Sequence, residues 1–439
     1  MIIFSIIQID EEMRKLSWLI LILTMVACSP VGTVTAIETK TEKPMSTNTP
    51  SFQENNVIHG GWLREPTLTP TNTPTAQNIL KERCAEILPA FPEDSIPPGT
   101  LVILSPDDLS LVDFRQQTQR TIHGIFDGVG ASPNGKWLSY IVIDPTGEND
   151  DLVIESADGQ KQAQFPFESS AIILDWIPWL DNERIWFPVW IGEEDPTTVV
   201  LNPFTGERQE LLPGYPDFAP FDHPVNSIKL PFVYNNVAYD PSLRFVVYPQ
   251  LFDHQYYVVL WDRETKQELV KIPDTGSYRH LPLWLPSNKA FVVVARPDRD
   301  GPKEWLMVSR DGGIRQLTHL GDLYSEFEFG LYTSLSPDGH YLAFGLSHEH
   351  DPDPYSSKEL IILNLQTLET VNTCIKFDHP VWSPDSRYLA VQYWDDTQKQ
   401  SFMAVVDPDQ GWAVKVFTDY SDKYKNLMVF PVAWLDSGK

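Results

Sequence analysis

The chain has 439 residues and a formal net charge of −27, from 60 acidic and 33 basic side chains. This negative charge argues against nucleic acid as a partner, because affinity for nucleic acid comes mainly from Lys and Arg side chains that neutralise phosphates. It also argues against electrostatic attachment to anionic lipids, so any membrane attachment must come from another source.

The beginning of the chain has the order of a secretory signal. Arg14 and Lys15 precede the apolar run 16–26, which is short for a bilayer span. The run ends in Met-Val-Ala-Cys at 25–28, which resembles a bacterial lipobox. This resemblance implies that 1–28 is a lipoprotein signal peptide that is cut just before Cys28. The thiol of Cys28 then carries the lipid, which alone anchors the exported protein to the membrane. The alternative is an uncleaved N-terminal anchor with an incidental cysteine.

Acidic residues occupy 10–12, just before the basic pair, which is unusual for a signal. A start at Met13 would place the basic residues directly at the N-terminus. We therefore expect translation to begin at Met13.

A tether and a lead-in follow the signal. Residues 29–76 are dominated by Thr, Pro, Ser, Asn and Glu, and contain the sequence Thr-Asn-Thr-Pro twice. This composition has little to bury and Pro restricts φ, so the segment is predicted to be an extended, disordered tether. Residues 77–98 are predicted to form a short amphipathic helix, over 77–87, and a lead-in to a folded domain at 99–439.

The folded domain is built on one repeat. A turn sequence of the Ser-Pro-Asp-Gly type precedes an apolar-aromatic strand roughly every 45–51 residues. The turns and their strands are 132–135 with 137–143, 336–339 with 341–346, 383–386 with 388–393, and, less clearly, 240–242 with 245–248, 285–288 with 291–294 and 179–182 with 185–187. Pro presets φ and Gly accepts positive φ, so each turn joins two strands of a hairpin. A second hairpin follows each one, and four strands per period make a propeller blade.

The two ends of the domain complement each other. Segments 101–104, 109–114 and 119–122 look like the last three strands of a blade, and 430–435 looks like an isolated first strand. Their pairing predicts an all-β propeller of seven four-stranded blades, closed by its N- and C-terminal strands, which removes exposed edges. Six blades are the alternative if the degenerate copy at 179–182 is not a blade.

These motifs resemble the TolB-type, WD-repeat-like β-propeller, whose repeat is a Trp-Ser-Pro-Asp-Gly turn followed by a Leu-Ala-Phe-like strand. Residues 382–385, Trp-Ser-Pro-Asp, with 388–391, Tyr-Leu-Ala-Val, match it best. The resemblance covers about residues 100–435. It implies a periplasmic interaction module or the non-catalytic half of a serine peptidase. The sequence has no Gly-x-Ser-x-Gly elbow of the kind that the peptidase domain requires.

A repeated sequence marks a candidate binding face. Phe-Asp-His-Pro-Val occurs at 221–225 and again at 377–381. In a propeller, the segment before each first strand lies at the mouth of the central channel, where loops carry recognition residues. The candidate residues of this face are His280, Tyr332, Asp378 and His379. Repetition of turn chemistry alone is the other explanation.

The densest cluster of metal-ligand residue types is 348–353, where His348, His350 and Asp351 are weak candidates. Its ligands are consecutive and interrupted by Pro, which favours a solvated acidic loop. We therefore expect neither a metal nor another cofactor.

Cys84 and Cys374 are left once Cys28 is assigned to the lipid. Two such thiols can pair in an oxidising compartment. A disulfide would tie the predicted helix to the propeller. Two separate buried thiols are the alternative.

The sequence favours a lipid-anchored binding or scaffolding module that captures a protein or glycan partner at the cell envelope on the extracytoplasmic side. A complete ring without an appended catalytic domain is the reason for this expectation. The alternative is a hydrolase or lyase at the channel mouth, with Asp378, His379 and His280 as acid–base or metal groups.

Overall fold

The computed structural model describes most of the chain after residue 79. The described residues are 80–144, 146, 150–167, 178–189, 197–211, 237–252, 255–274, 281–347, 358–395, 400–416, 429–436 and 438. The predictions for the signal, Met13, Cys28, the tether, His280 and residues 348–353 lie outside them. Within the described ranges, no helix has the length and apolar character that a membrane crossing requires. All described strands belong to the compact unit 68–439.

Most strands form short antiparallel sheets in which neighbours in sequence are neighbours in space. The first sheet contains β28 (Phe430–Leu435), β3 (Thr100–Ser105), β4 (Asp108–Asp113) and β5 (Thr118–His123). The second contains β6 (Phe126–Ala131), β7 (Trp137–Val142), β8 (Asp151–Ser156) and β9 (Gln162–Pro166). The third contains β10 (Ile185–Val189), β11 (Thr197–Leu201) and β12 (Arg208–Leu211).

Two further sheets repeat this pattern with four strands each. One contains β13 (Ala238–Tyr239), β14 (Phe245–Phe252), β15 (Gln255–Asp262) and β16 (Gln267–Asp274). The other contains β17 (Leu283–Trp284), β18 (Ala290–Ala295), β19 (Glu304–Ser309) and β20 (Ile314–Gln316). The 3-10 turn η3 (Leu320–Asp322) follows the last of these strands.

The remaining strands share one long strand. They are β21 (Glu328–Leu335), β22 (Tyr341–Ser347), β23 (Lys358–Asn364), β24 (Thr370–Trp382), β25 (Leu389–Asp395), β26 (Gln400–Asp407) and β27 (Trp412–Val416), with β1 (Leu80–Glu82) and β2 (Glu86–Leu88) at the edges. The first part of β24 pairs with β23, and its part from Phe377 onward pairs with β25. β24 is therefore the outer strand of β21–β24 and the inner strand of β24–β27.

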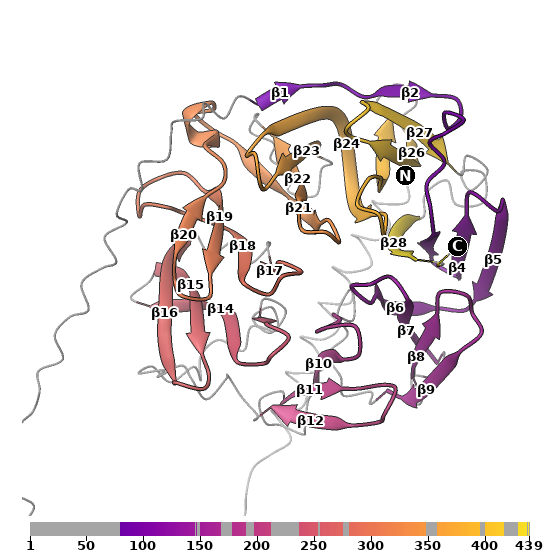
Figure 1. Cartoon of the computed structure of the whole chain (residues 1–439), viewed down its shortest axis with the longest axis horizontal. Helices are drawn as coiled ribbons and strands as arrows, with labels where there is room; N and C mark the ends of the chain where they lie inside the picture. Colours follow the sequence, from indigo (N-terminus) through magenta and orange to yellow (C-terminus); the bar gives the residue numbers. More distant parts are fainter. Residues whose placement is uncertain are drawn as a thin grey trace, which may run out of the picture. The chain divides into compact units, whose positions relative to one another are not determined.

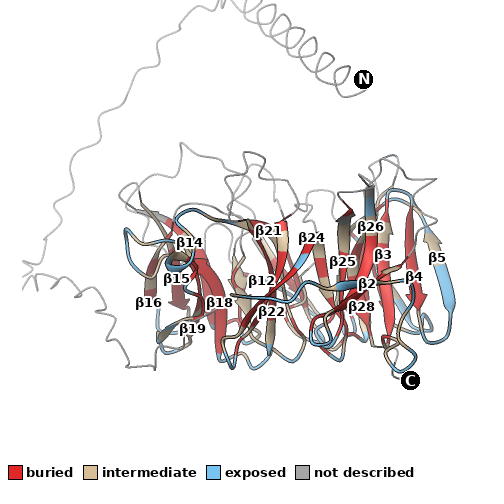
Figure 2. Cartoon of the chain, turned by 90° about the horizontal axis from the view of Figure 1, so that it is seen from above, coloured by how far each residue is buried: buried red, intermediate tan, exposed pale blue. Residues whose placement is uncertain are grey.

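The fold is a β-propeller. Figure 1 shows the sheets around a common centre, with the first strand of each sheet innermost. Each of the buried clusters in the described part takes its residues from two neighbouring sheets, and the clusters follow one another around the ring. Figure 2 shows these buried strands in red, with the outer strand β5 largely exposed. The described strands form seven sheet units. The number of blades stays a prediction, because residues 212–236 between two of the units are not described.

The predicted composite blade is present. β28 pairs antiparallel with β3, from Phe430 opposite Leu104 to Leu435 opposite Thr100. The last strand of the described chain thus supplies the inner strand of the sheet that β3 begins. The predicted apolar-aromatic strands that follow the repeated turns are also present, as β7, β10, β14, β18, β22 and β25.

The repeated turn is held by its serine. In the β21–β22 turn, the Ser336 hydroxyl donates to Asp338 Oδ1 at 2.6 Å and accepts the N–H of Tyr341 at 2.9 Å. Gly339 closes the turn at φ +71°, a conformation that glycine adopts without steric cost. The N–H of Asp338 donates to the Ser386 hydroxyl of the next turn at 3.0 Å. The repeat therefore fixes each hairpin and also joins neighbouring hairpins.

Replacing Gly339 by Ala is expected to destabilise the protein more than replacing Gly206 by Ala. Both glycines have φ near +70°, which costs an L residue about 1–2 kcal/mol. A Cβ on Gly206 meets nothing within 4 Å, whereas a Cβ on Gly339 would lie 2.8 Å from Pro286 Cδ in the neighbouring turn. We expect an additional loss of about 1–3 kcal/mol at Gly339, measured by urea unfolding. Equal losses of stability at Gly339 and Gly206 would show that a methyl group at position 339 does not clash with Pro286.

The predicted helix at 77–87 is wrong for its described part. Residues 80–88 contain two short strands, β1 and β2, which pair in parallel with β24 and β27 at the outer rim. The outer edges of β24 and β27 offer backbone groups with which an extended segment can form hydrogen bonds and a helix cannot. The expected apolar helix face is also not formed, because Leu80 packs on the core while the Ile87 side chain is 40% exposed.

Candidate binding site

Irregular inner strands distinguish one side of the ring. β21, β24, β28 and β6 each contain a register shift, between Phe329 and Thr333, Asp378 and Val381, Pro431 and Ala433, and Asp127 and Gly130. These are the first strands of consecutive units, and each contacts the next. Bulges turn side chains away from the regular alternation of a strand and are common beside functional sites. Side chains that these bulges bring together are therefore candidates for a binding site.

Three rings stack across three of these strands. The ring centroid of His379 in β24 lies 3.9 Å from that of Tyr332 in β21, at an interplanar angle of 34°. Its other face lies 4.0 Å from the ring of Phe430 in β28, at 19°. His379 is thus held between aromatic side chains of the two neighbouring inner strands.

The backbone of His379 is strained. Its φ is +50°, in the left-handed region that L residues rarely adopt. Gly128 in β6 has φ +56° and lies four residues before its turn serine, Ser132, as His379 lies four residues before Ser383. The fold thus places a glycine in this conformation in one unit and a histidine in another. Strain retained in this way suggests a role beyond folding.

Burial lowers the pKa of His379 to about 4, while a hydrogen bond to the Gln392 side chain acts in the opposite direction. The imidazole is therefore neutral at neutral pH. Its Nδ1 is buried and has no hydrogen-bond partner within the described residues. A group with so low a pKa is a weak general base at pH 7. The arrangement suits a neutral hydrogen-bonding group better than acid–base chemistry.

The structure brings together two of the four residues predicted for this face, Tyr332 and His379. Asp378 belongs to the same bulge and pairs in register with Gln392. Phe430 was missed, although a signal for it exists. His379 and Phe430 both precede Pro-Val in their strands, at 379–381 and 430–432. No group of three or more potential metal ligands occurs among the described residues.

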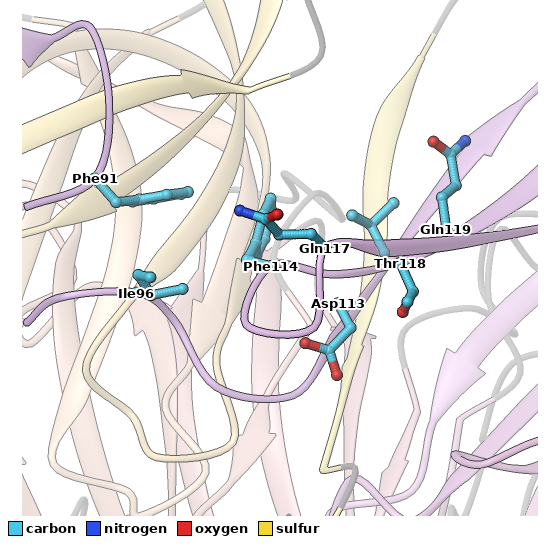
Figure 3. Close-up of a pocket in the computed structure, with 8 residues that line it drawn as sticks. Phe91, Ile96, Asp113, Phe114, Gln117, Thr118 and Gln119 are labelled. Atoms are coloured by element: carbon cyan, nitrogen blue, oxygen red, sulfur yellow. The ribbon is translucent and has the colours of Figure 1, made fainter. Parts of the chain in front are cut away.

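A cavity of about 430 Å³ lies elsewhere, between the lead-in and the β4–β5 turn (Figure 3). Phe91 and Ile96 line it from the lead-in, and Phe114 and Gln117 line it from the turn. Phe91 and Phe114 meet edge to face, with their ring centroids 5.3 Å apart. None of the residues that line it belongs to the inner-strand bulges.

No family model and no curated protein matches this sequence. Solved structures do match. TolB from Acinetobacter baumannii is 14% identical over 76% of this chain and 81% of its own, with a TM-score of 0.40. Oligogalacturonate lyase from Vibrio parahaemolyticus is 13% identical over 71% and 85%, with a TM-score of 0.46. The β-propeller domain of the Trilobed protease from Pyrococcus furiosus is 12% identical over 64% and 82%, with a TM-score of 0.41. The likeness extends to the fold alone.

Proposed function

We propose that the protein is an envelope binding module, anchored through a lipid on Cys28 and exposed on the extracytoplasmic side. Its propeller captures a protein or glycan partner at the bulged inner strands. The observation that carries this proposal is His379, a strained residue stacked between Tyr332 and Phe430 with an unused buried nitrogen.

Three features of His379 support binding. The conformation has a steric cost that glycine avoids at the equivalent Gly128, so folding alone does not require a histidine there. The ring is fixed by its two neighbours, which reduces the entropy lost when a partner binds. The buried Nδ1 has no hydrogen-bond partner within the described residues, so it can accept or donate one hydrogen bond once binding moves the groups that cover it. Asp378, the residue before His379 in the same bulge, provides a carboxylate.

The test is capture of partners from envelope extract by the full chain and by two variants. His379→Phe keeps an aromatic ring between Tyr332 and Phe430 but removes both ring nitrogens. His123→Phe makes the same change on the outer strand β5, where the His123 side chain is 83% exposed. We expect a partner that the native chain and His123→Phe retain and that His379→Phe retains at least about tenfold less, a loss typical of one interface hydrogen bond to a fixed group.

Protease and glycosidase treatment of the extract identifies the class of the partner. Loss of the captured material after protease indicates a protein, and loss after glycosidase indicates a glycan. Equal retention by the native chain and both variants would contradict a binding role for this site.

A further inference from the structure

The beginning and the end of the described propeller meet at one boundary, which we call the seam. It separates β3–β5 from the C-terminal strands β24–β28. Among the described strands, the backbone pairing of β3 with β28 is the one ladder that joins β3–β5 to the C-terminal strands. The indole of Trp434 in β28 supports this pairing by donating to the carbonyl of Pro98, just before β3, at 2.9 Å. On the other side of the seam lies the unit β24–β27, which packs on β3 and β28 through a common buried cluster.

An extended segment crosses this seam on the outside. We call residues 80–91 the strap. β1 pairs with β24 and β2 pairs with β27, so the strap runs across the rim of two units, as Figure 1 shows at the edge of the ring. Phe91 then contacts Trp412 on one side of the seam, at 6.2 Å between ring centroids, and Phe114 on the other, at 5.3 Å.

A disulfide fastens the strap. Cys84, between β1 and β2, is bonded to Cys374 in β24. The two cysteines are 290 positions apart in sequence, and their Cα atoms are 4.8 Å apart. Backbone hydrogen bonds flank the bond, from Arg83 N–H to the Asn372 carbonyl at 2.9 Å and from Ala85 N–H to the Thr373 carbonyl at 3.0 Å. Without the disulfide, the backbone of the strap is held by two ladders of three residues each, beside the ring contacts of Phe91, and ladders this short can fray.

We propose that the strap is a second latch of the propeller ring, parallel to the β28–β3 pairing, and that a dithiol opens it. Cys84 and Cys374 are both exposed at the rim, so a thiolate can reach the bond. One thiolate of the dithiol attacks a cystine sulfur and forms a mixed disulfide. The second thiol of the reagent then displaces the remaining protein thiol. Two electrons and two protons pass to the protein, which gains two thiols, and the dithiol becomes a disulfide.

If two latches hold one seam, the effects of losing each of them on the β3–β28 pairing are not independent. While either one holds, β3 and β28 stay paired, and loss of a single latch has a small effect on the seam. Loss of both opens it, so their combined effect exceeds the product of the separate effects. A strap that stabilises only its own residues would instead give independent effects.

The test is hydrogen exchange of the folded full chain carrying Cys28→Ser, so that the only cysteines are Cys84 and Cys374. Exchange is followed in β1, β2, β3 and β28, with and without dithiothreitol, for the parent and for Trp434→Ala. Trp284→Ala is the matched control, because its indole donates to the Ala238 carbonyl at 3.2 Å, away from the seam. Reduction takes place on folded protein, so the result does not depend on folding of a cysteine-free variant.

We expect reduction to raise exchange in β1 and β2 in every protein. In Trp434→Ala, reduction should raise exchange in β3 and β28 more than about tenfold above the product of two effects, that of reduction alone and that of the substitution alone. In Trp284→Ala, exchange in these strands should not exceed that product. A Cys84→Ser/Cys374→Ser double variant should behave as the reduced parent does. Multiplicative effects in Trp434→Ala, or strap protection that survives reduction, would overturn the proposal.

Discussion

Replacing Arg310 by Ala is expected to lower the free energy of unfolding by about 3–5 kcal/mol, because it removes the ion-pair partner of a buried carboxylate. Asp240 is 0% exposed and pairs with Arg310 from the neighbouring sheet. The carboxylate also accepts the N–H of Phe245 at 2.7 Å. The guanidinium lies over the rings of Phe245 and Trp284, at 5.0 and 5.8 Å from their centroids. Arg310 thus joins two units of the ring through charge and packing.

Urea unfolding of three further variants separates these contributions. Arg310→Met keeps most of the packing but not the charge, so it should lose nearly as much stability as Arg310→Ala. Adding Asp240→Asn to Arg310→Met removes the uncompensated charge and should recover part of that loss. Arg208→Ala breaks an exposed pair with Glu210 and should cost less than about 1 kcal/mol. A similar small loss for Arg310→Ala would show that the buried pair does not hold the units together.

Stability is expected to fall as the pH drops from about 6.5 to about 4, with His379 as a large contributor. Burial lowers the pKa of His379 from its ordinary value of 6.5 to about 4 in the folded protein. Between these values the unfolded chain binds a proton that the folded chain does not. The contribution of His379 is therefore complete above pH 6.5, declines as the pH falls, and is lost below pH 4. It is on the order of 3 kcal/mol.

Comparison with His379→Phe isolates this effect. The variant keeps the ring stack with Tyr332 and Phe430 and the same backbone conformation, but it does not titrate. Other titrating groups act in both proteins, so the comparison removes most of their effect. The difference in unfolding free energy between the two proteins should change with pH between 4 and 6.5 and be constant above 7. A difference that does not vary with pH would contradict the low pKa.

The fold was predictable where short-range chemistry determines it. The Ser-Pro-Asp-Gly turns specify their hairpins locally, through the hydroxyl of Ser336 or Ser383 and a residue at positive φ. The composite blade was also predictable, because four strands per period left one strand missing near the start and one isolated near Phe430. Both arguments need only the repeat and its count.

The remaining features depend on contacts between distant residues. The strap is extended because β24 and β27 present free edges, which no pattern within residues 77–87 reveals. His379 and Tyr332 were predicted as members of one face. The bulges that stack them, the positive φ of His379 and the contribution of Phe430 depend on how neighbouring inner strands approach each other. Local sequence supplied the residues of the site, and the ring supplied its geometry.

The composite blade has a consequence for how the protein is made. Trp434 and its acceptor Pro98 are 336 positions apart, so the contact that joins β28 to β3 is among the most distant in sequence. Such contacts form slowly, because a long loop must close before they contribute. While the chain is being synthesised from its N-terminus, the inner edge of β3 has no pairing strand until residues 430–435 emerge. An open strand edge is prone to pairing with other chains, so a chaperone that covers β3 should reduce aggregation during synthesis.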